Sequence, residues 1–317
     1  MRPPNLICHC DWSKTAKKRW IAKAVLGIDG NYTVYAPECV DAASALLPRL
    51  RAESGDQGRV LLGFDFPIGI PLNYAERAGA TSFRDFLLQL GVNDWREFFH
   101  VCNSPDQISV YRPFYPNRCD AGVLRQQLFD GHGVRSMEPL LRLCERGGNG
   151  QRQACSLFWT LGGNQVGKAA LCGWKDVLIP AMTDDSVGLW PFDGTIESLL
   201  QDKRVVIAET YPAECYGWFP DKLLRSKSDI DSRREYGSAL LKWAERDNVV
   251  VEQTLMNAIR QGFPVGKDDA FDAVVGLFGM IQICTGKRSM EEPTSKDVQK
   301  IEGWILGRRS SPTMFSY

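Results

Sequence analysis

Three segments near the N-terminus carry the pattern of β-strands. Residues 6–10, 20–26 and 32–36 are runs of mostly apolar and aromatic residues, and Asp29-Gly30-Asn31 separates the last two. A short turn of Gly and Asn between such runs favours a β-hairpin. The pattern predicts an antiparallel meander of three strands.

The next two segments change from helical to strand spacing. A helix capped by Asp41 is predicted to run to Leu50, with Ala45, Leu46 and Leu47 on its apolar face. Residues 59–64 then form an apolar run, which predicts a fully buried strand. The first part of the chain therefore has the predicted order βββαβ.

Regular patterns return only after residue 201. Residues 204–208 predict a strand, residues 232–246 and 251–259 predict helices, and a last helix is predicted to begin near Asp268. The stretch between, 67–201, has short helical and loop patterns rich in Trp, Phe, Arg and Gly. We therefore predict an α/β protein with a core of residues 1–66 and 202–317, and a large, mainly helical insertion of residues 67–201 packed against that core.

The charge of the chain is balanced, since its 317 residues include 38 Lys and Arg against 38 Asp and Glu. No global positive field attracts nucleic acid, so a polyanion would have to bind a local patch. The longest apolar stretch, 273–284, is too short to span a bilayer, and His9 and Asp11 interrupt the N-terminal apolar run. We expect a cytoplasmic protein with no membrane partner.

Acidic residues stand where strands end and where the last helix begins. Asp11, Asp65 and Glu209 each follow an apolar strand, and Asp269 and Asp272 share a face of the last helix. The strands before Asp11 and Asp65 would be neighbours if they pair in parallel, as the helix between them allows. Carboxylates from distant parts of a chain bind Mg²⁺ or Mn²⁺ in phosphoryl chemistry. We predict a catalytic metal site of Asp11, Asp65, Asp269 and Asp272, with Glu209 as an additional catalytic carboxylate.

Several acids of these motifs also have a structural alternative. Asp65 could satisfy the amides of a turn, and the Glu-Thr-Tyr-Pro run that begins at Glu209 could be a structural turn. Asp268 alone would be an ordinary N-cap. Asp272 lies among apolar residues and needs a partner there, which a metal or a basic residue would supply.

Two segments offer contacts to phosphate. Lys18 belongs to a basic loop directly after Asp11, and Gln165 and Lys168 end a Gly-rich segment, 159–168. This segment lacks the spacing of a P-loop but could still present amides and a lysine to a substrate. We predict that Lys18, Gln165 and Lys168 bind substrate, against the alternatives of a solvated hairpin and of a turn leading into a helix.

Several motifs occur in order along almost the whole chain, and together they carry a family resemblance. They are Asp11-Trp12-Ser13, Gly63-Phe64-Asp65-Phe66-Pro67-Ile68-Gly69-Ile70-Pro71, Ala208-Glu209-Thr210-Tyr211-Pro212-Ala213-Glu214, Asp268-Asp269-Ala270-Phe271-Asp272-Ala273 and Glu302-Gly303-Trp304-Ile305. Together they resemble domain-of-unknown-function family 429, a set of predicted ribonuclease-H-like nucleases.

The resemblance implies a ribonuclease-H-like fold of order βββαβαβα, with a mixed five-stranded sheet and flanking helices. In that fold the acids lie on the first strand, the fourth strand and the final helix, which Asp11, Asp65 and Asp269 or Asp272 match. Glu209, on the fifth strand, lies outside the usual nuclease set. Fold analogy alone does not establish a reaction.

We therefore expect a metal-dependent nuclease, a hydrolase of phosphodiester bonds in DNA or RNA that uses Mg²⁺ or Mn²⁺. One alternative is a phosphotransferase or hydrolase that acts on a small nucleotide-like substrate. The other is a non-catalytic scaffold or regulatory protein that retains the fold.

Overall fold

A mixed β-sheet forms the centre of the computed structural model, which describes residues 3–118, 122–147, 153–161, 166–219 and 225–309. In these residues the sheet has eight strands in the order β6-β7-β5-β1-β2-β3-β8, with β4 also paired to β2. The strands are β1 (Leu6–Asp11), β2 (Trp20–Leu26), β3 (Tyr32–Val34), β4 (Glu38–Cys39), β5 (Val60–Phe64), β6 (Val187–Leu189), β7 (Val205–Glu209) and β8 (Val250–Val251). The α/β class is therefore confirmed.

Strand direction changes at β1. On one side β1 is antiparallel to β2, which is antiparallel to β3, as the meander predicted. On the other side β1 is parallel to β5, and β5 is parallel to β7. The helix between β1 and β5 provides the crossover that a parallel pair requires. The parallel strands β1, β5 and β7 all end at the same edge of the sheet.

The prediction of five strands was incomplete. Strands β4, β6 and β8 are only two or three residues long, too short for an alternating or apolar run to stand out. Strand β6 pairs in parallel with β7 although it belongs to the range 67–201. The end of that range is thus part of the central sheet.

The helices cover both faces of the sheet. They are α1 (Ala43–Glu53), α2 (Leu72–Ala78), α3 (Phe83–Gln89), α4 (Arg125–Gly131), α5 (Val166–Gly173), α6 (Ile179–Ala181), α7 (Ile196–Asp202), α8 (Pro212–Cys215), α9 (Ile230–Arg246), α10 (Gln253–Gln261) and α11 (Lys267–Cys284). Two expected caps were wrong: Ala42 rather than Asp41 precedes α1, and Gly266 rather than Asp268 precedes α11. Asp268 lies instead in the first turn of α11.

Alternate residues of the strands point to opposite faces of the sheet and pack in two separate hydrophobic cores. Leu6, Cys8 and Cys10 of β1 face α1 and the segments of the range 67–201. Ile7 of β1 faces the other way, toward α11, which is buried along almost its whole length. Strands covered on both faces have no polar side, which explains the continuous apolar runs in the sequence.

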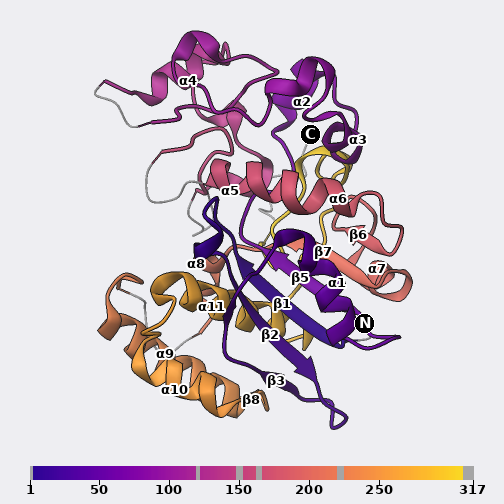
Figure 1. Ribbon diagram of the computed structural model, residues 1–317, viewed down its shortest axis with the longest axis vertical. Helices are drawn as coiled ribbons and strands as arrows, with labels where there is room; N and C mark the ends of the chain where they lie inside the picture. The colour runs from indigo at the N-terminus through magenta and orange to yellow at the C-terminus, as the bar shows by residue number, and fades with distance from the viewer. Residues whose placement is uncertain (1–2, 119–121, 148–152, 162–165, 220–224, 310–317) are drawn as a thin grey trace.

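Most of the described residues of the range 67–201 form an aromatic lobe above one face of the sheet, whereas Cys144, Trp190 and Ile196 belong to the core on the other face. Figure 1 shows α2, α3 and α4 far from β2 and β3, with α5 and α6 between them and the sheet, while α9, α10 and α11 group on the other side. Trp174 stacks against Phe98 and contacts Phe83 edge to face. Its indole Nε1 donates to the carbonyl oxygen of Pro67 at 2.7 Å. The lobe is thus fixed to the segment that directly follows Asp65.

Among the described residues, no helix combines the length and the apolar composition needed to cross a membrane.

Candidate active site

Asp11 and Asp65 lie side by side at the edge where the parallel strands end. The register pairs Cys10 of β1 with Phe64 of β5, so the next residue on each strand is one of the two acids. The backbone N–H of Trp12 donates to Oδ1 of Asp65 at 2.7 Å. Asp11 is buried, with 9% of its surface exposed. The parallel pairing thus brings together two carboxyl groups from distant parts of the chain.

Helix α11 adds two more acids to this edge. Asp269 is partly buried, and Asp272, one turn later, is buried on the face that packs against the sheet. Asp272 has two partners: the hydroxyl of Tyr216 donates to its Oδ1, and the ammonium group of Lys227 contacts its Oδ2. A basic residue and a phenol therefore provide the partners that a buried acid on an apolar helix requires.

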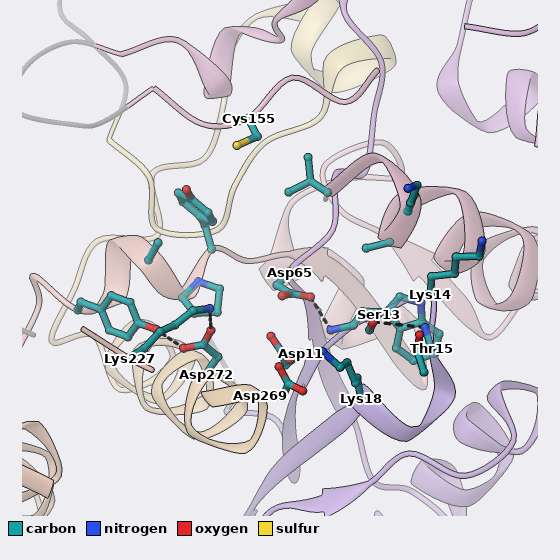
Figure 2. Close-up of a pocket in the computed structure, with 18 residues that line it drawn as sticks. Asp11, Ser13, Lys14, Thr15, Lys18, Asp65, Cys155, Lys227, Asp269 and Asp272 are labelled. Atoms are coloured by element: carbon teal, nitrogen blue, oxygen red, sulfur yellow. Dashed lines mark hydrogen bonds and ion pairs between the residues drawn. The ribbon is translucent and has the colours of Figure 1, made fainter. Parts of the chain in front are cut away.

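These four acids line one cavity of about 500 Å³. In Figure 2, Asp11, Asp65 and Asp269 point toward one another at its centre, and Lys227 lies on Asp272 to one side. Lys14 and Lys18 lie on the other side, and Cys155 lies across the cavity from the acids. The remaining lining residues are Trp12, Ser13, Thr15, Val166, Lys168, Ala169, Tyr211, Pro212, Ala213 and Tyr216.

The carboxyl groups at the centre repel one another. Burial, followed by the negative charges of Asp65 and Asp272, raises the pKa of Asp11 well above its ordinary value. Burial also raises the pKa of Asp65, to about 6, although hydrogen bonds from Asp11 and from the amide of Trp12 lower it. A divalent cation would favour the ionised form of both groups.

Lysines line the same cavity as these acids. Lys14 and Lys18 come from the loop after β1, and Lys168 comes from the first turn of α5. The ammonium group of Lys168 donates to the carbonyl oxygen of Asn117 at 3.2 Å. Burial and the nearby charge of Lys14 lower the pKa of Lys168. Two ammonium groups that repel each other in a cavity favour an anionic ligand between them.

The loop that carries these lysines is held rigidly. The guanidinium group of Arg19 lies 4.3 Å from the ring centre of Trp12, and its Nε donates to the carbonyl oxygen of Ser13 at 2.7 Å. Arg19 also forms an ion pair with Asp176 at 3.2 Å. The loop after Asp11 therefore forms a wall of the cavity that is held in a fixed position.

Glu209 is the predicted site residue that lies elsewhere. It is buried at the end of β7, but its carboxylate is turned away from the cavity and bound by Arg142 at 2.6 and 2.7 Å. The same carboxylate accepts a hydrogen bond from the backbone N–H of Ile68 at 2.6 Å. These contacts make Glu209 an anchor for the segment after Asp65. Glu209 thus has the structural role that the sequence left open as an alternative.

Of the predicted substrate-binding residues, Lys18 and Lys168 line the cavity. Gln165 lies outside the described residues. Three further residues of the region were not expected from the sequence: Lys227, Tyr216 and Arg142. Tyr216 follows the Glu-Thr-Tyr-Pro run by a single helical turn and could have been found there. Lys227 and Arg142 have no local pattern that separates them from surface basic residues.

Comparisons of the chain with protein-family models, with curated proteins and with solved structures found no match.

The chemistry of the acids suits a hard cation, since Mg²⁺ and Mn²⁺ bind carboxylate oxygens. Asp11, Asp65 and Asp269 offer such oxygens in one place, and burial, with smaller contributions from neighbouring carboxylates, raises the pKa of each. Within the described residues, no three His, Cys, Asp or Glu side chains are grouped so that they could hold a metal ion as they stand. Binding of a cation would therefore require these side chains to move.

Proposed function

We propose that this protein is a metal-dependent phosphodiesterase, a nuclease, built on a ribonuclease-H-like core. The observation that carries the proposal is the convergence of Asp11, Asp65 and Asp269 on one cavity that lysines also line. Carboxylates that hold a cation and lysines that hold phosphate are the two parts that phosphodiester hydrolysis requires.

The topology supports the proposed core. An antiparallel meander, a helical crossover to a strand parallel with β1, and a further parallel strand follow the order expected for it. The acids lie on the first strand of the meander, after the crossover strand and on the helix that packs across β1. The resemblance to domain-of-unknown-function family 429 implies the same positions.

Asp11, Asp65 and Asp269 would hold Mg²⁺ or Mn²⁺. When bound, the cation supplies Lewis-acid stabilisation of the charge that develops on the phosphate. The amide of Trp12 fixes the orientation of the Asp65 carboxyl group, so that this acid is held in place for the cation.

The lysines orient the substrate. Lys18 lies close enough to Asp269 for its charge to lower the pKa of that group, so it can contact the phosphate nearest the acids. Lys14 and Lys168 line the same cavity, the charge of Lys14 lowers the pKa of Lys168, and together they would bind a neighbouring phosphate or other anionic group. This arrangement suits a substrate with more than one phosphate, as a nucleic acid strand has.

A small phosphorylated metabolite is the second candidate substrate. The cavity of about 500 Å³ lies within the range of pockets that hold small molecules, about 300–1,000 Å³. The formal net charge of zero also gives no long-range attraction to a polymer. A phosphotransferase or hydrolase of a small nucleotide would use the same acids and lysines.

A substrate panel separates the two candidates. Labelled single-stranded, duplex, hybrid and branched DNA and RNA, together with mononucleotides and cyclic nucleotides, would be incubated with Mn²⁺ and the wild-type protein. Asp11→Asn and Asp269→Asn remove one acid each, and Asp56→Asn, at an exposed loop position, is the matched control. Cleavage of a polymer that both site variants lose and the control keeps supports the nuclease. Turnover of small nucleotides alone supports the second candidate.

A further inference from the structure

Both oxygens of the Asp272 carboxylate are already occupied by protein donors. The Tyr216 hydroxyl contacts Oδ1 and the Lys227 ammonium contacts Oδ2. Only 6% of the Asp272 side chain is exposed, so little room remains for another ligand. Asp272 therefore differs from Asp11, Asp65 and Asp269, although all four line the same cavity.

Both partners of Asp272 are themselves held in place. The guanidinium group of Arg233 is buried in α9 and donates to the carbonyl oxygens of Lys227 at 2.6 Å and Gly262 at 2.8 Å. The carbonyl oxygen of Tyr216 accepts from the hydroxyl of Tyr236 at 2.9 Å. The position of Lys227 is thus built into the fold.

Lys227 acts on the other acids as well as on Asp272. Its side chain is 44% exposed and lines the cavity, so part of the ammonium group faces the space where substrate would bind. The negative charges of Asp11 and Asp65 also stabilise its charged form. An ammonium group has three N–H donors, and Asp272 uses only part of this capacity.

We propose that Lys227 supplies the second positive charge of the site, so that the protein binds one divalent cation, at Asp11, Asp65 and Asp269. Two-cation sites place two ions about 3.5–4 Å apart to stabilise both the attacking and the leaving oxygen. Here the ammonium group of Lys227 takes the position of one of them and contacts a phosphate oxygen of the substrate. Asp272 serves as the anchor of Lys227. This inference rests on the proposed cation site.

The number of bound ions tests the inference without any assay of activity. Mn²⁺ binding, followed by the loss of the electron paramagnetic resonance signal of the free ion, gives the stoichiometry directly. We expect one Mn²⁺ per wild-type chain and two per chain of Lys227→Met, since this variant frees Oδ2 of Asp272. Lys14→Met is the matched control, because it removes a lysine from the same cavity but leaves Asp272 engaged, and we expect it to bind one ion.

A second variant keeps the test decisive if Lys227→Met does not fold. Asp272→Asn retains hydrogen-bonding capacity toward Tyr216, and we expect it to bind one Mn²⁺ with unchanged affinity. Two ions on the wild type, one ion on folded Lys227→Met, or a large loss of affinity in Asp272→Asn would each overturn the role of Lys227.

The outcomes also separate this inference from the proposed function. One ion on the wild type, two on Lys227→Met and no cleavage of any substrate would remove the nuclease and leave Lys227 as the second charge. Absence of bound Mn²⁺ on the wild type would overturn both.

Discussion

Arg142 and Glu209 form a bidentate ion pair, with N–O distances of 2.6 and 2.7 Å, in which the arginine is fully buried and the glutamate nearly so. Arg142 also donates to the carbonyl oxygens of Ile68 and Glu302. The pair therefore joins β7, the aromatic lobe, the segment after Asp65 and the C-terminal part of the described chain. The ion pair therefore helps to position Asp65, and it lies outside the cavity.

Removing Arg142 should destabilise the protein strongly. Arg142→Met would leave the carboxylates of Glu209 and Glu145 buried without their counter-ion, and breaking one such pair costs about 3–5 kcal/mol. The free energy of unfolding, measured by urea denaturation, checks this. In the double variant Arg142→Met/Glu209→Gln the loss should be smaller than the sum of the two single losses, because the uncompensated charge of Glu209 is gone and only that of Glu145 remains. A loss below about 1 kcal/mol for Arg142→Met would contradict the anchoring role of the pair.

The acid pair should make stability depend on pH when no divalent cation is present. The pKa of Asp65 in the folded protein is about 6, above its ordinary value of 3.8. Between these values the folded state binds more protons than the unfolded state, so stability should fall as pH rises from about 4 to about 6. Asp65→Asn should remove the contribution of Asp65 to this dependence, while the raised pKa of Asp11 keeps part of it, and the variant should be more stable than the wild type at pH 8 by about 1–3 kcal/mol. Urea denaturation in EDTA across the pH range measures both effects, and an unchanged pH profile in Asp65→Asn would refute the assignment.

Excess Mn²⁺ should reverse this instability. A ligand that binds only the folded state stabilises it by about 2.7 kcal/mol at a concentration one hundred times its Kd. We expect Mn²⁺ to raise the Tm of the wild type and of Asp56→Asn, but not that of Asp11→Asn. Differential scanning calorimetry with and without EDTA provides the comparison. An equal rise in all three proteins would indicate that the ion binds away from Asp11.

The close approach of α11 to β1 should tolerate no added methyl group. A Cβ at Gly276 would lie 2.3 Å from the ring of His9, a buried residue two positions before Asp11. Gly276→Ala should therefore cost about 1–3 kcal/mol through overpacking. Gly217→Ala is the matched control, because its nearest contact would be 3.6 Å. Thermal denaturation compares the two variants, and equal stability would show that α11 can move away from β1 without penalty.

The sequence predicts the parts of the site that depend on local patterns. Asp11 and Asp65 end apolar strands, and Asp269 and Asp272 have helical spacing, so periodicity and one parallel pairing bring them together. Glu209 has the same local signature as Asp65, but a distant arginine binds it. No sequence pattern around Arg142 indicates that this residue is buried, because its burial depends on the packing of the lobe over β7.

The same reason explains the other residues that the sequence did not predict. Lys227 reaches Asp272 from a segment with no periodic pattern, and its place depends on Arg233 of α9. Strand β6 is recognised only by its pairing with β7. Contacts between distant segments decide these features, whereas propensity and spacing decide the long strands and helices.

The most direct test of the central claim is the rate at which the best substrate of the panel is cleaved with Mn²⁺ by the wild type and by Asp11→Asn. Both proteins would first be shown to have the same circular dichroism spectrum. We predict cleavage by the wild type, no cleavage in EDTA, and a loss of at least about a hundredfold in Asp11→Asn. Equal rates in the two proteins, or cleavage that persists in EDTA, would contradict a metal-dependent phosphodiesterase at this cavity.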